Sequence, residues 1–229
     1  MRHTLKSVLL QSSIIRRILG KRRFSNSADY WEKRYEKGGT SGSGSYNRLA
    51  DFKNRILNNF VSEMGIKTVI EWGCGDGNQL KNAKYPQYVG LDVAPKAVEL
   101  CKKIFSNDST KKFYTTQEWL LMNNSGGDFR EKFDCAMSID VIFHLVEDEV
   151  YTQYLKNLFD SSNKFVVIYS NDIEEPYVGG HERHREFSKY VSAHFPDWKL
   201  TKKVLNEYPY DPQYPDSTSF SDFYFYEKE

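Results

Sequence analysis

The chain has 229 residues, of which 39% are apolar, 28% charged and 15% aromatic. This length and composition predict one globular domain with short appendages and exclude a fibrous or wholly disordered protein. The formal net charge is +1, but residues 1–28 hold seven Lys or Arg and no acid, which leaves 25 basic and 31 acidic side chains for the rest. A body with this excess of acid is not a general polyanion binder, so no nucleic acid partner is expected.

Residues 1–28 form the first expected unit, a basic amphipathic segment. Over residues 4–23, apolar side chains lie roughly on one face of a helix that ends in a cluster of Arg and Lys. Such a helix can dock on a partner or contact a membrane surface peripherally, whereas the acid-free, Arg- and Ser-rich composition of residues 1–24 is also typical of a mitochondrial transit peptide. The sequence does not decide between a docked or membrane-surface helix, a transit peptide and a solvated terminus.

Residues 29–66 form the second expected unit, a helical cap. An aromatic and charged helical piece at 30–35 precedes the stretch 38–45, which consists of Gly, Ser and Thr and predicts a flexible loop. Apolar residues then recur at helical spacing from Phe52 to Met64. This spacing predicts an amphipathic helix.

Residues 67–229 form the third expected unit, in which short β-rich runs alternate with helical ones. The predicted strands are 68–72, 88–92, 112–115, 133–138 and 165–170, and the clearest helix is 150–159. Strands separated by helices imply right-handed crossovers and a doubly wound, mostly parallel sheet. After a helix near 185–194, the runs 199–206 and 220–227 are joined by a Pro-rich loop, so this last pair is predicted to be antiparallel.

The three cysteines, Cys74, Cys101 and Cys135, are widely spaced and form no C-x-x-C pair. Neither a disulfide framework nor a zinc site is indicated, and a reducing compartment such as the cytoplasm fits best. No apolar run approaches the ~20 residues needed to cross a bilayer, so the protein is expected to be soluble or at most peripheral.

A glycine-rich turn at 73–77 directly follows the strand at 68–72, and a helix is expected after it. Glycine is needed where backbone approaches a ligand closely, and a helix N-terminus offers free N–H groups. The next strand ends in Asp92, which is well placed to accept both hydroxyls of a ribose. Together these features predict a nucleoside site. The dinucleotide fingerprint needs a third glycine at position 78, where this chain has Asn78, which disfavours an NAD-type oxidoreductase.

The pattern E-x-G-x-G-x-G at 71–77, followed by G-L-D at 90–92, resembles the class I S-adenosylmethionine-dependent methyltransferases. The resemblance covers residues 67–170 and implies the cofactor S-adenosyl-L-methionine and a Rossmann-like, seven-stranded, mostly parallel sheet with an antiparallel C-terminal hairpin. More narrowly, the segments 31–35, 38–45, 138–147 and 181–185 look like a bacterial methyltransferase group of unsettled acceptor. The resemblance implies the cofactor-binding residues Glu71, Gly73, Gly75, Gly77, Asp92, Val93, Gln117, Glu118 and Ser138, with the glycine turn under the methionine part, Asp92 on the ribose, and Val93 with Gln117 or Glu118 near the adenine.

The family's fourth motif falls at 133–140, which implies that Asp140 and His144 border the reaction centre. Neither the Asp/Asn-Pro-Pro-aromatic motif of N6-adenine methyltransferases nor the Pro-Cys nucleophile of the cytosine C5 enzymes is present, so neither class is favoured. Methyl transfer chiefly needs alignment of the acceptor, with a base as a second contribution. The candidate bases are His144, His181 and His184, and we expect His144 to act with an ordinary pKa and Asp140 to orient its ring.

The motif H-E-R-H at 181–184 is one residue short of the zincin spacing, so no metal is expected there. Arg183 and Arg185 flank the histidines and suit an anionic acceptor. The expected activity is methyl transfer to an oxygen or nitrogen of a small molecule or glycan. A catalytically silent, methyltransferase-like binding subunit and the NAD-type oxidoreductase remain the alternatives.

Overall fold

The computed structural model describes residues 24–125 and 128–229. The expected amphipathic helix, the transit peptide and the membrane contact through residues 4–23 lie outside the described residues. Within the described ranges, no helix is both long and apolar enough to span a bilayer.

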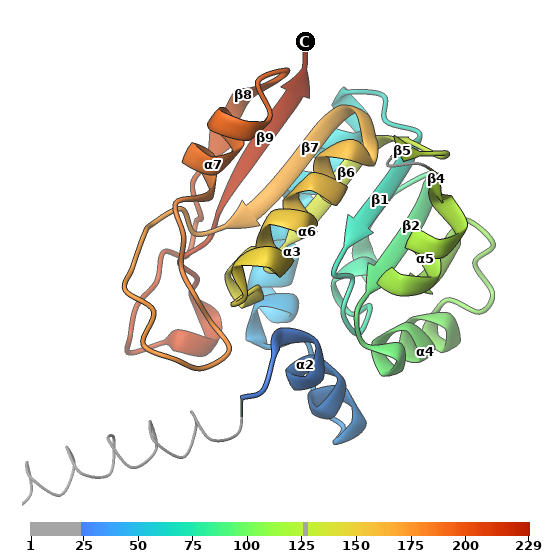
Figure 1. The fold of residues 1–229 in the computed structure, drawn as a ribbon. Coiled ribbons are helices and arrows are strands. Elements are labelled where there is room, and N and C mark those ends of the chain that lie inside the picture. The colour runs from blue at the N-terminus through green and yellow to red at the C-terminus, as the bar shows by residue number, and fades with distance from the viewer. Residues whose placement is uncertain (1–23, 126–127) are drawn as a thin grey trace, which may run out of the picture.

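A seven-stranded sheet with the order β3-β2-β1-β6-β7-β9-β8 forms the centre of the molecule (Figure 1). The first five of these strands run parallel, and β9 is antiparallel to both β7 and β8. This arrangement confirms the predicted fold class. The strands are β1 (Thr68–Trp72), β2 (Gln87–Asp92), β3 (Lys111–Thr115), β6 (Phe133–Ile139), β7 (Ser162–Ser170), β8 (Trp198–Val204) and β9 (Asp222–Lys228).

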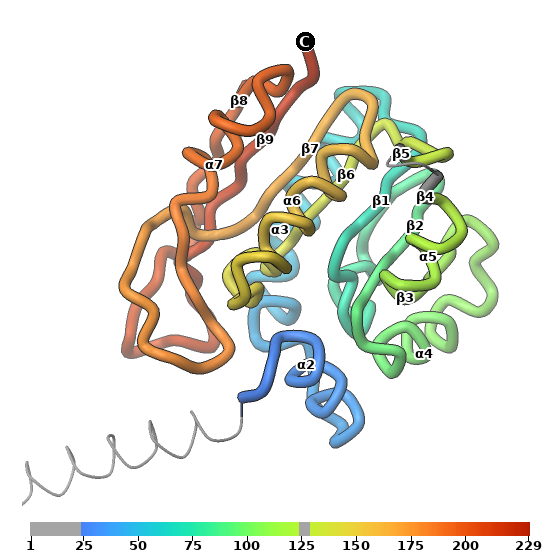
Figure 2. The backbone as a smooth tube through the Cα atoms, viewed as in Figure 1, coloured from blue at the N-terminus to red at the C-terminus, as the bar shows by residue number. Residues whose placement is uncertain are grey.

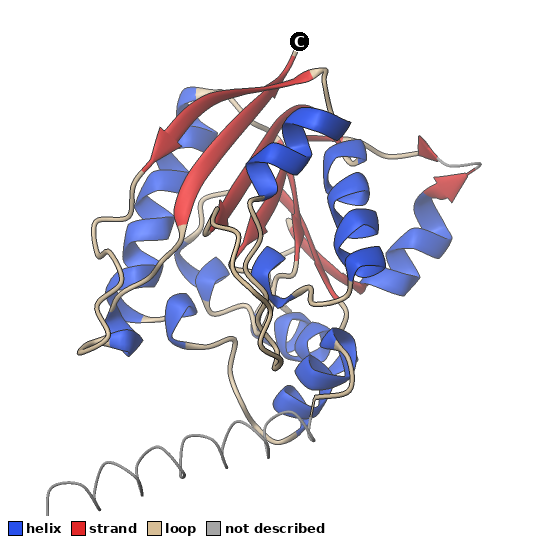
Figure 3. Cartoon of the chain, turned by 60° about the vertical axis from the view of Figure 1, so that its left-hand side comes forward, coloured by secondary structure: helices blue, strands red, loops and turns tan. Residues whose placement is uncertain are grey.

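Helices cover both faces of the sheet (Figure 3). Strand residues point alternately to the two faces, and each face has its own apolar core. Trp119 of α5, Leu155 of α6 and Phe187 of α7 belong to one core, whereas Leu57 of α3 and Val98 of α4 belong to the other. The helices are α2 (Ser27–Glu36), α3 (Asn47–Glu63), α4 (Pro95–Ile104), α5 (Thr116–Asn123), α6 (Asp148–Asp160) and α7 (Phe187–His194), with short 3-10 helices η1 (Ser43–Ser45), η2 (Gln79–Asn82), η3 (Ile142–His144) and η4 (Pro215–Ser217).

The prediction of a helix after the glycine turn is wrong, because only the short 3-10 helix η2 forms there. The side chains of Asn54 and Asn58, on the neighbouring α3, donate to the carbonyls of Gln79 and Asn82, and Pro86 then leads into β2. These carbonyls are therefore satisfied without a longer helix. A two-stranded hairpin of β4 (Asn124–Ser125) and β5 (Asp128–Phe129) was also not predicted.

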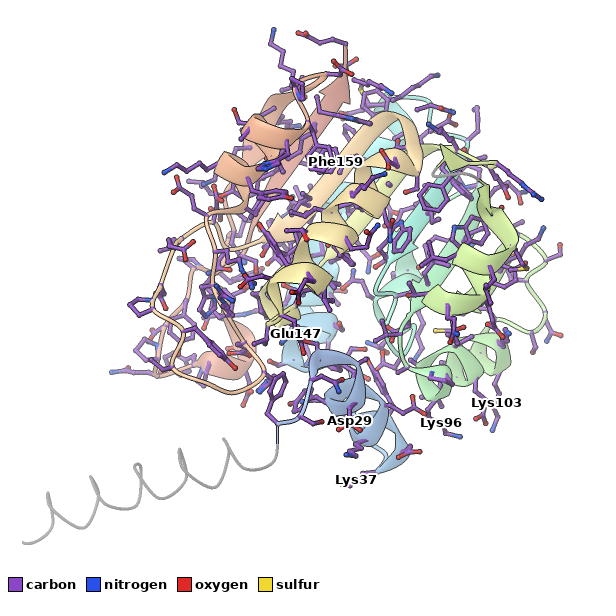
Figure 4. All side chains as sticks on the ribbon, in the orientation of Figure 1. Asp29, Lys37, Lys96, Lys103, Glu147 and Phe159 are labelled. Carbon is purple, nitrogen blue, oxygen red and sulfur yellow. The ribbon has the colours of Figure 1, made fainter. Side chains whose placement is uncertain are left out.

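The N-terminal part of the described chain lies across the carboxyl ends of the parallel strands. Figures 1 and 2 show α2 below these ends, with the chain continuing into α3 behind the sheet. Two contacts fasten α2 to the start of α6: the Ser27 N–H donates to Glu147 Oε1 at 2.9 Å, and the Ser27 hydroxyl donates to Glu147 Oε2 at 2.6 Å. Glu147 lies between the two elements (Figure 4). The cap thus closes the sheet edge at which α/β folds bind ligands.

Candidate functional site

The glycine turn after β1 is fixed to the end of β2 by backbone hydrogen bonds. The N–H groups of Gly73 and Cys74 both donate to the Leu91 carbonyl, at 2.7 and 2.8 Å, and the Gly75 N–H donates to Asp92 Oδ2 at 2.9 Å. Gly73 and Gly75 have φ angles of +88° and +59°, in the left-handed region that favours glycine. A Cβ at Gly73 would lie 2.4 Å from Val141 Cγ2. The turn therefore needs glycine for both conformation and space.

A cavity of about 540 Å³ opens at the carboxyl ends of β1, β2 and β6, bounded by α2, α6 and the glycine turn. This volume lies within the range of small-molecule and cofactor sites. It brings together seven of the residues expected from the sequence. They are Glu71, Gly73, Gly75, Asp92, Val93, Asp140 and His144.

Other expected cofactor residues do not line this cavity. The Ser138 hydroxyl is fully buried and accepts a hydrogen bond from the Tyr154 hydroxyl at 2.7 Å, and a Cβ at Gly77 would meet Cys101 Sγ at 2.9 Å. Gln117 lines an adjoining, open hollow that shares Val93, Thr116 and Leu120 with the cavity. Glu118 is exposed, and its carboxylate accepts the Thr115 N–H at 2.8 Å at the start of α5. These four residues therefore support the walls or lie beside the cavity.

Two buried carboxyl groups face the cavity beside the glycine turn. Burial raises the pKa of Asp92 to about 6, against the opposing effect of the Ala94 and Gly75 N–H groups that it accepts. Burial also raises the pKa of Glu71 to about 7, although the Tyr88 hydroxyl donates to its carboxylate at 2.7 Å. A cationic ligand would favour the ionised form of both groups, so this end of the cavity is suited to positive charge.

Asp140 directly follows β6 and has a left-handed conformation, with φ of +58°. Its Oδ2 accepts Lys53 Nζ at 2.7 Å, and its Oδ1 accepts the Ser221 hydroxyl at 3.1 Å. Lys53 is 1% exposed, so this ion pair fixes the carboxylate at the cavity wall. The expectation that Asp140 orients the His144 ring is wrong, because Asp140 binds Lys53 and Ser221, while the His144 Nδ1 faces the His181 carbonyl.

The imidazole of His144 is held by a different group. Its Nδ1 lies 3.1 Å from the carbonyl oxygen of His181, and the Trp31 ring meets it edge-on at 4.9 Å between centroids. Burial lowers the pKa of His144 to about 3. The expected ordinary pKa is therefore wrong, because the ring is shielded from water and beside other rings. The ring is neutral at physiological pH and a weak base.

His184 and the two arginines that follow His181 bind protein groups instead of facing the cavity. His184 Nδ1 lies 2.6 Å from Asn171 Nδ2. Arg185 donates to the Leu145 carbonyl at 2.6 Å and pairs with Asp148 at 3.0 Å, and Arg183 also pairs with Asp148. These contacts tie the segment 181–185 to the chain after β6, which removes the argument for an anionic acceptor at the arginines.

The cap contributes site residues that the sequence reading did not assign. Trp31, Tyr35 and Ser41 line the cavity from α2 and the loop after it, while Thr116 and Leu120 line it from α5. The Ser41 hydroxyl accepts the Asp76 N–H at 2.8 Å, and a Cβ at Gly75 would lie 2.2 Å from it. In the sequence, the aromatic segment and the Gly/Ser loop were the features that could have indicated these residues. Their contact with the glycine turn could not be predicted, because it depends on the fold.

The comparisons with known proteins agree with this geometry. Residues 69–164 match the family model described as a methyltransferase domain. The structure resembles the N-methyltransferase NodS from Bradyrhizobium japonicum in complex with S-adenosylhomocysteine, with TM-score 0.66 and 13% identity over 89% of this chain and 99% of that chain. It also resembles the magnesium protoporphyrin IX methyltransferase from Synechocystis with bound S-adenosylhomocysteine, with TM-score 0.59 and 14% identity over 88% and 97% of the two chains.

A third similar structure is the methyltransferase domain of a bacterial Hen1, with TM-score 0.55 and 19% identity over 76% of this chain and 97% of that chain. No curated protein matches the chain in sequence. At these identities the structural likenesses show the fold, and the acceptors of these proteins differ from one another.

Proposed function

We propose that the chain binds S-adenosylmethionine and transfers its methyl group to an oxygen or nitrogen of a small molecule or glycan. Two findings support this: residues 69–164 match a methyltransferase domain, and the fold resembles methyltransferases that bind S-adenosylhomocysteine. The observation that supports this most directly is the pair of buried carboxyl groups, Glu71 and Asp92, at the glycine turn. The cofactor carries a sulfonium and an ammonium charge, which this end of the cavity suits.

The residues at the cavity fit the parts of the cofactor. The backbone of Gly73 to Gly75 would lie along its methionine part, Asp92 has oxygens for the ribose hydroxyls, and Val93 offers an apolar surface for the adenine. Asp92 is 7% exposed, so its hydrogen bonds to the ligand would be shielded from water. When bound, S-adenosylmethionine supplies an electrophilic methyl group.

The acceptor would enter the part of the cavity between α2 and the chain after β6. Trp31, Asp140 and His144 line this part. Because the His144 ring is a weak base, we assign it the task of contacting and aligning the acceptor instead of removing its proton at neutral pH. Alignment can contribute up to ~7–11 kcal/mol to the rate in favourable cases, so a strong base is not required.

Transfer of a labelled methyl group tests the proposal. The full chain is incubated with S-adenosylmethionine labelled in the methyl group and with fractionated cell extract, and the labelled product is identified by mass spectrometry. The Asp92→Ala variant is the matched control. We expect label in a small molecule or glycan with the wild-type chain and little with the variant.

A parallel sample treated with ribonuclease separates the other outcomes. Loss of the labelled product after this treatment would mean that the acceptor is RNA and that the proposed acceptor class is wrong. Absence of label from every fraction, with cofactor binding intact, would favour the catalytically silent subunit. Binding of a nicotinamide cofactor in place of S-adenosylmethionine would favour the oxidoreductase.

A further inference from the structure

Three side chains with metal-ligating atoms meet beside the cavity, and one of them, His144, also lines it. His144 comes from η3, and His181 and Glu182 come from the loop between β7 and α7. One ligand atom from each of the three lies within 4.8 Å of the other two. His144 and His181 are 37 positions apart in the chain, so no local spacing motif could indicate the cluster.

Backbone and side-chain hydrogen bonds hold the two segments together. The Arg183 N–H donates to the Phe143 carbonyl at 2.7 Å, and the Arg183 guanidinium donates to the Val146 carbonyl at 3.1 Å. The Tyr30 ring stacks on the His181 ring at 4.3 Å between centroids. The two histidines are therefore held by the packing of α2, η3 and this loop, whereas Glu182 is exposed and its carboxylate lies 3.5 Å from His181 Nε2.

The hydrogen bond to His144 determines which of its nitrogens has a free lone pair. A carbonyl oxygen only accepts, so His144 Nδ1 carries the proton that it donates to the His181 carbonyl at 3.1 Å. Nε2 is then unprotonated. A ring N–H donated to a backbone carbonyl, with the second nitrogen left as ligand, is the usual arrangement of metal-binding histidines.

We propose that His144, His181 and Glu182 bind a divalent transition-metal cation such as Zn²⁺ or Co²⁺ beside the acceptor. Two imidazoles and one carboxylate are a ligand set that such cations favour, and three protein ligands leave coordination positions open. His184, the other histidine of the 181–185 segment, is not in the set. The Asn171 amide N–H donates to its Nδ1, so the neutral ring carries its proton on Nε2 and offers no free lone pair.

The role of the cation rests on the proposed function, whereas its binding does not. His144 belongs to the cluster and also lines the cavity, so it connects the cation site with the part of the cavity assigned to the acceptor. A cation there can hold an acceptor oxygen and favour its deprotonated form. His144 would then align the acceptor through the cation that its Nε2 holds.

Cobalt binding to the full, untagged chain tests the site. Protein treated with EDTA and dialysed is titrated with Co²⁺ alone and with Zn²⁺ alone, by calorimetry and, for Co²⁺, by visible absorption. We expect one cation per chain and at least tenfold weaker binding by His181→Gln and by Glu182→Gln. His194→Gln is the control, because His194 is exposed and contacts only the Tyr190 region of its own helix.

Binding of S-adenosylhomocysteine by every variant, measured by calorimetry, shows that the fold is intact. Absence of saturable Co²⁺ and Zn²⁺ binding, or equal binding by the wild type and both cluster variants, would overturn the metal site even if methyl transfer is found. Cation binding as expected, together with no methyl transfer to any fraction, would support the site and refute the proposed function. The two inferences can therefore fail separately.

Discussion

Ser41 and Asp76 exchange two hydrogen bonds across 35 positions of the chain: the Ser41 N–H donates to Asp76 Oδ2 at 2.9 Å, and the Asp76 N–H donates to Ser41 Oγ at 2.8 Å. The Tyr46 hydroxyl donates to the same Oδ2 at 2.8 Å. The Gly/Ser loop is thus fastened to the glycine turn and forms part of the site.

We predict that Gly75→Ala displaces this loop. The new Cβ would lie 2.2 Å from Ser41 Oγ, at a residue whose φ is already +59°. Proteolysis between Gly38 and Ser45 should become several-fold faster, and S-adenosylhomocysteine should bind more weakly. Gly65→Ala is the control, because Gly65 has a similar φ of +63° but nothing within 4 Å of its Cβ position. Equal cleavage of both variants would mean that the loop does not depend on the turn.

We predict that Asp92→Ala weakens S-adenosylmethionine binding by ~1.5–3 kcal/mol, because charge-assisted hydrogen bonds to the ribose hydroxyls are lost. The Asp92 carboxylate also accepts the Gly75 and Ala94 N–H groups, so part of the loss comes from the turn itself. Calorimetry gives the affinity and circular dichroism checks the fold. An unchanged affinity would contradict the placement of the ribose.

We predict a pH-dependent stability difference between the wild type and Glu71→Gln. Burial raises the pKa of Glu71 in the folded chain to about 7 from 4.5. The contribution of Glu71 to the free energy of unfolding is therefore fully present below pH ~4.5. As the pH rises through about 7, up to ~3 kcal/mol of this contribution is lost. Urea denaturation of both proteins, without cofactor, should show the wild type losing stability relative to the variant over this range. A constant difference would mean that Glu71 is ionised throughout.

The same carboxyl group predicts how cofactor binding depends on pH. Because the ionised carboxylate attracts a cationic ligand, the affinity for S-adenosylmethionine should rise between pH 5.5 and 8. Glu71→Gln should flatten this rise near pH 7. If the wild-type affinity instead falls as the pH increases, the two buried acids do not attract the cofactor through their ionised forms.

We predict that His144→Gln lowers the methyl transfer rate by about 10²-fold through poor alignment, with cofactor affinity unchanged. Since burial lowers the pKa of this ring to about 3, the wild-type rate should show no acidic limb from His144 between pH 5 and 8. His184→Gln should stay within a few fold of the wild type, because His184 contacts Asn171 and does not line the cavity. A limb near pH 6.5 that disappears in His144→Gln would restore the role of general base.

We predict that Lys53→Met destabilises the fold by about 3–5 kcal/mol, because Asp140 would lose the partner of a largely buried charge. Lys53→Met combined with Asp140→Asn should recover part of this loss. Arg55→Met on the same helix is the control: its pair with Glu207 is about half exposed on both sides and should contribute less than ~1 kcal/mol. Urea denaturation gives the free energy of unfolding of all three variants. Equal losses of stability in Lys53→Met and Arg55→Met would contradict the prediction.

Much of the sheet could be predicted from the sequence, because buried parallel strands consist of continuous apolar runs bounded by turn-forming residues. β1 has the predicted bounds 68–72, and the antiparallel pair at the C-terminus follows from a connection without a helix. The glycine turn and Asp92 could be placed at the cavity for the same reason, since both lie at strand ends. The helix after the turn could not be excluded, because the hydrogen bonds from Asn54 and Asn58 of α3 to the carbonyls of η2 depend on how α3 packs beside it.

The geometry on the acceptor side of the site could not be predicted, because it depends on contacts between residues that lie far apart in the sequence. Helical spacing from Asp140 to His144 predicted a hydrogen-bonded pair, but η3 begins at Ile142 and Asp140 turns to Lys53. The burial that lowers the pKa of His144 comes from α2 and the loop at 181–185, which lie far away in the sequence. Local patterns therefore placed Asp140 and His144 at the sheet edge but predicted the wrong hydrogen-bond partners for them.

The cap is fastened at both ends of the cavity, by Ser27 to Glu147 and by Ser41 to Asp76. In the proposed reaction, a cofactor of nucleoside size and its acceptor would lie beneath these contacts, so the contacts would have to open and re-form in every catalytic cycle. Each holds a buried or half-buried carboxylate that water would solvate on opening. We therefore expect the release of S-adenosylhomocysteine, and not the chemical step, to limit turnover, with a burst of methylated product in the first cycle.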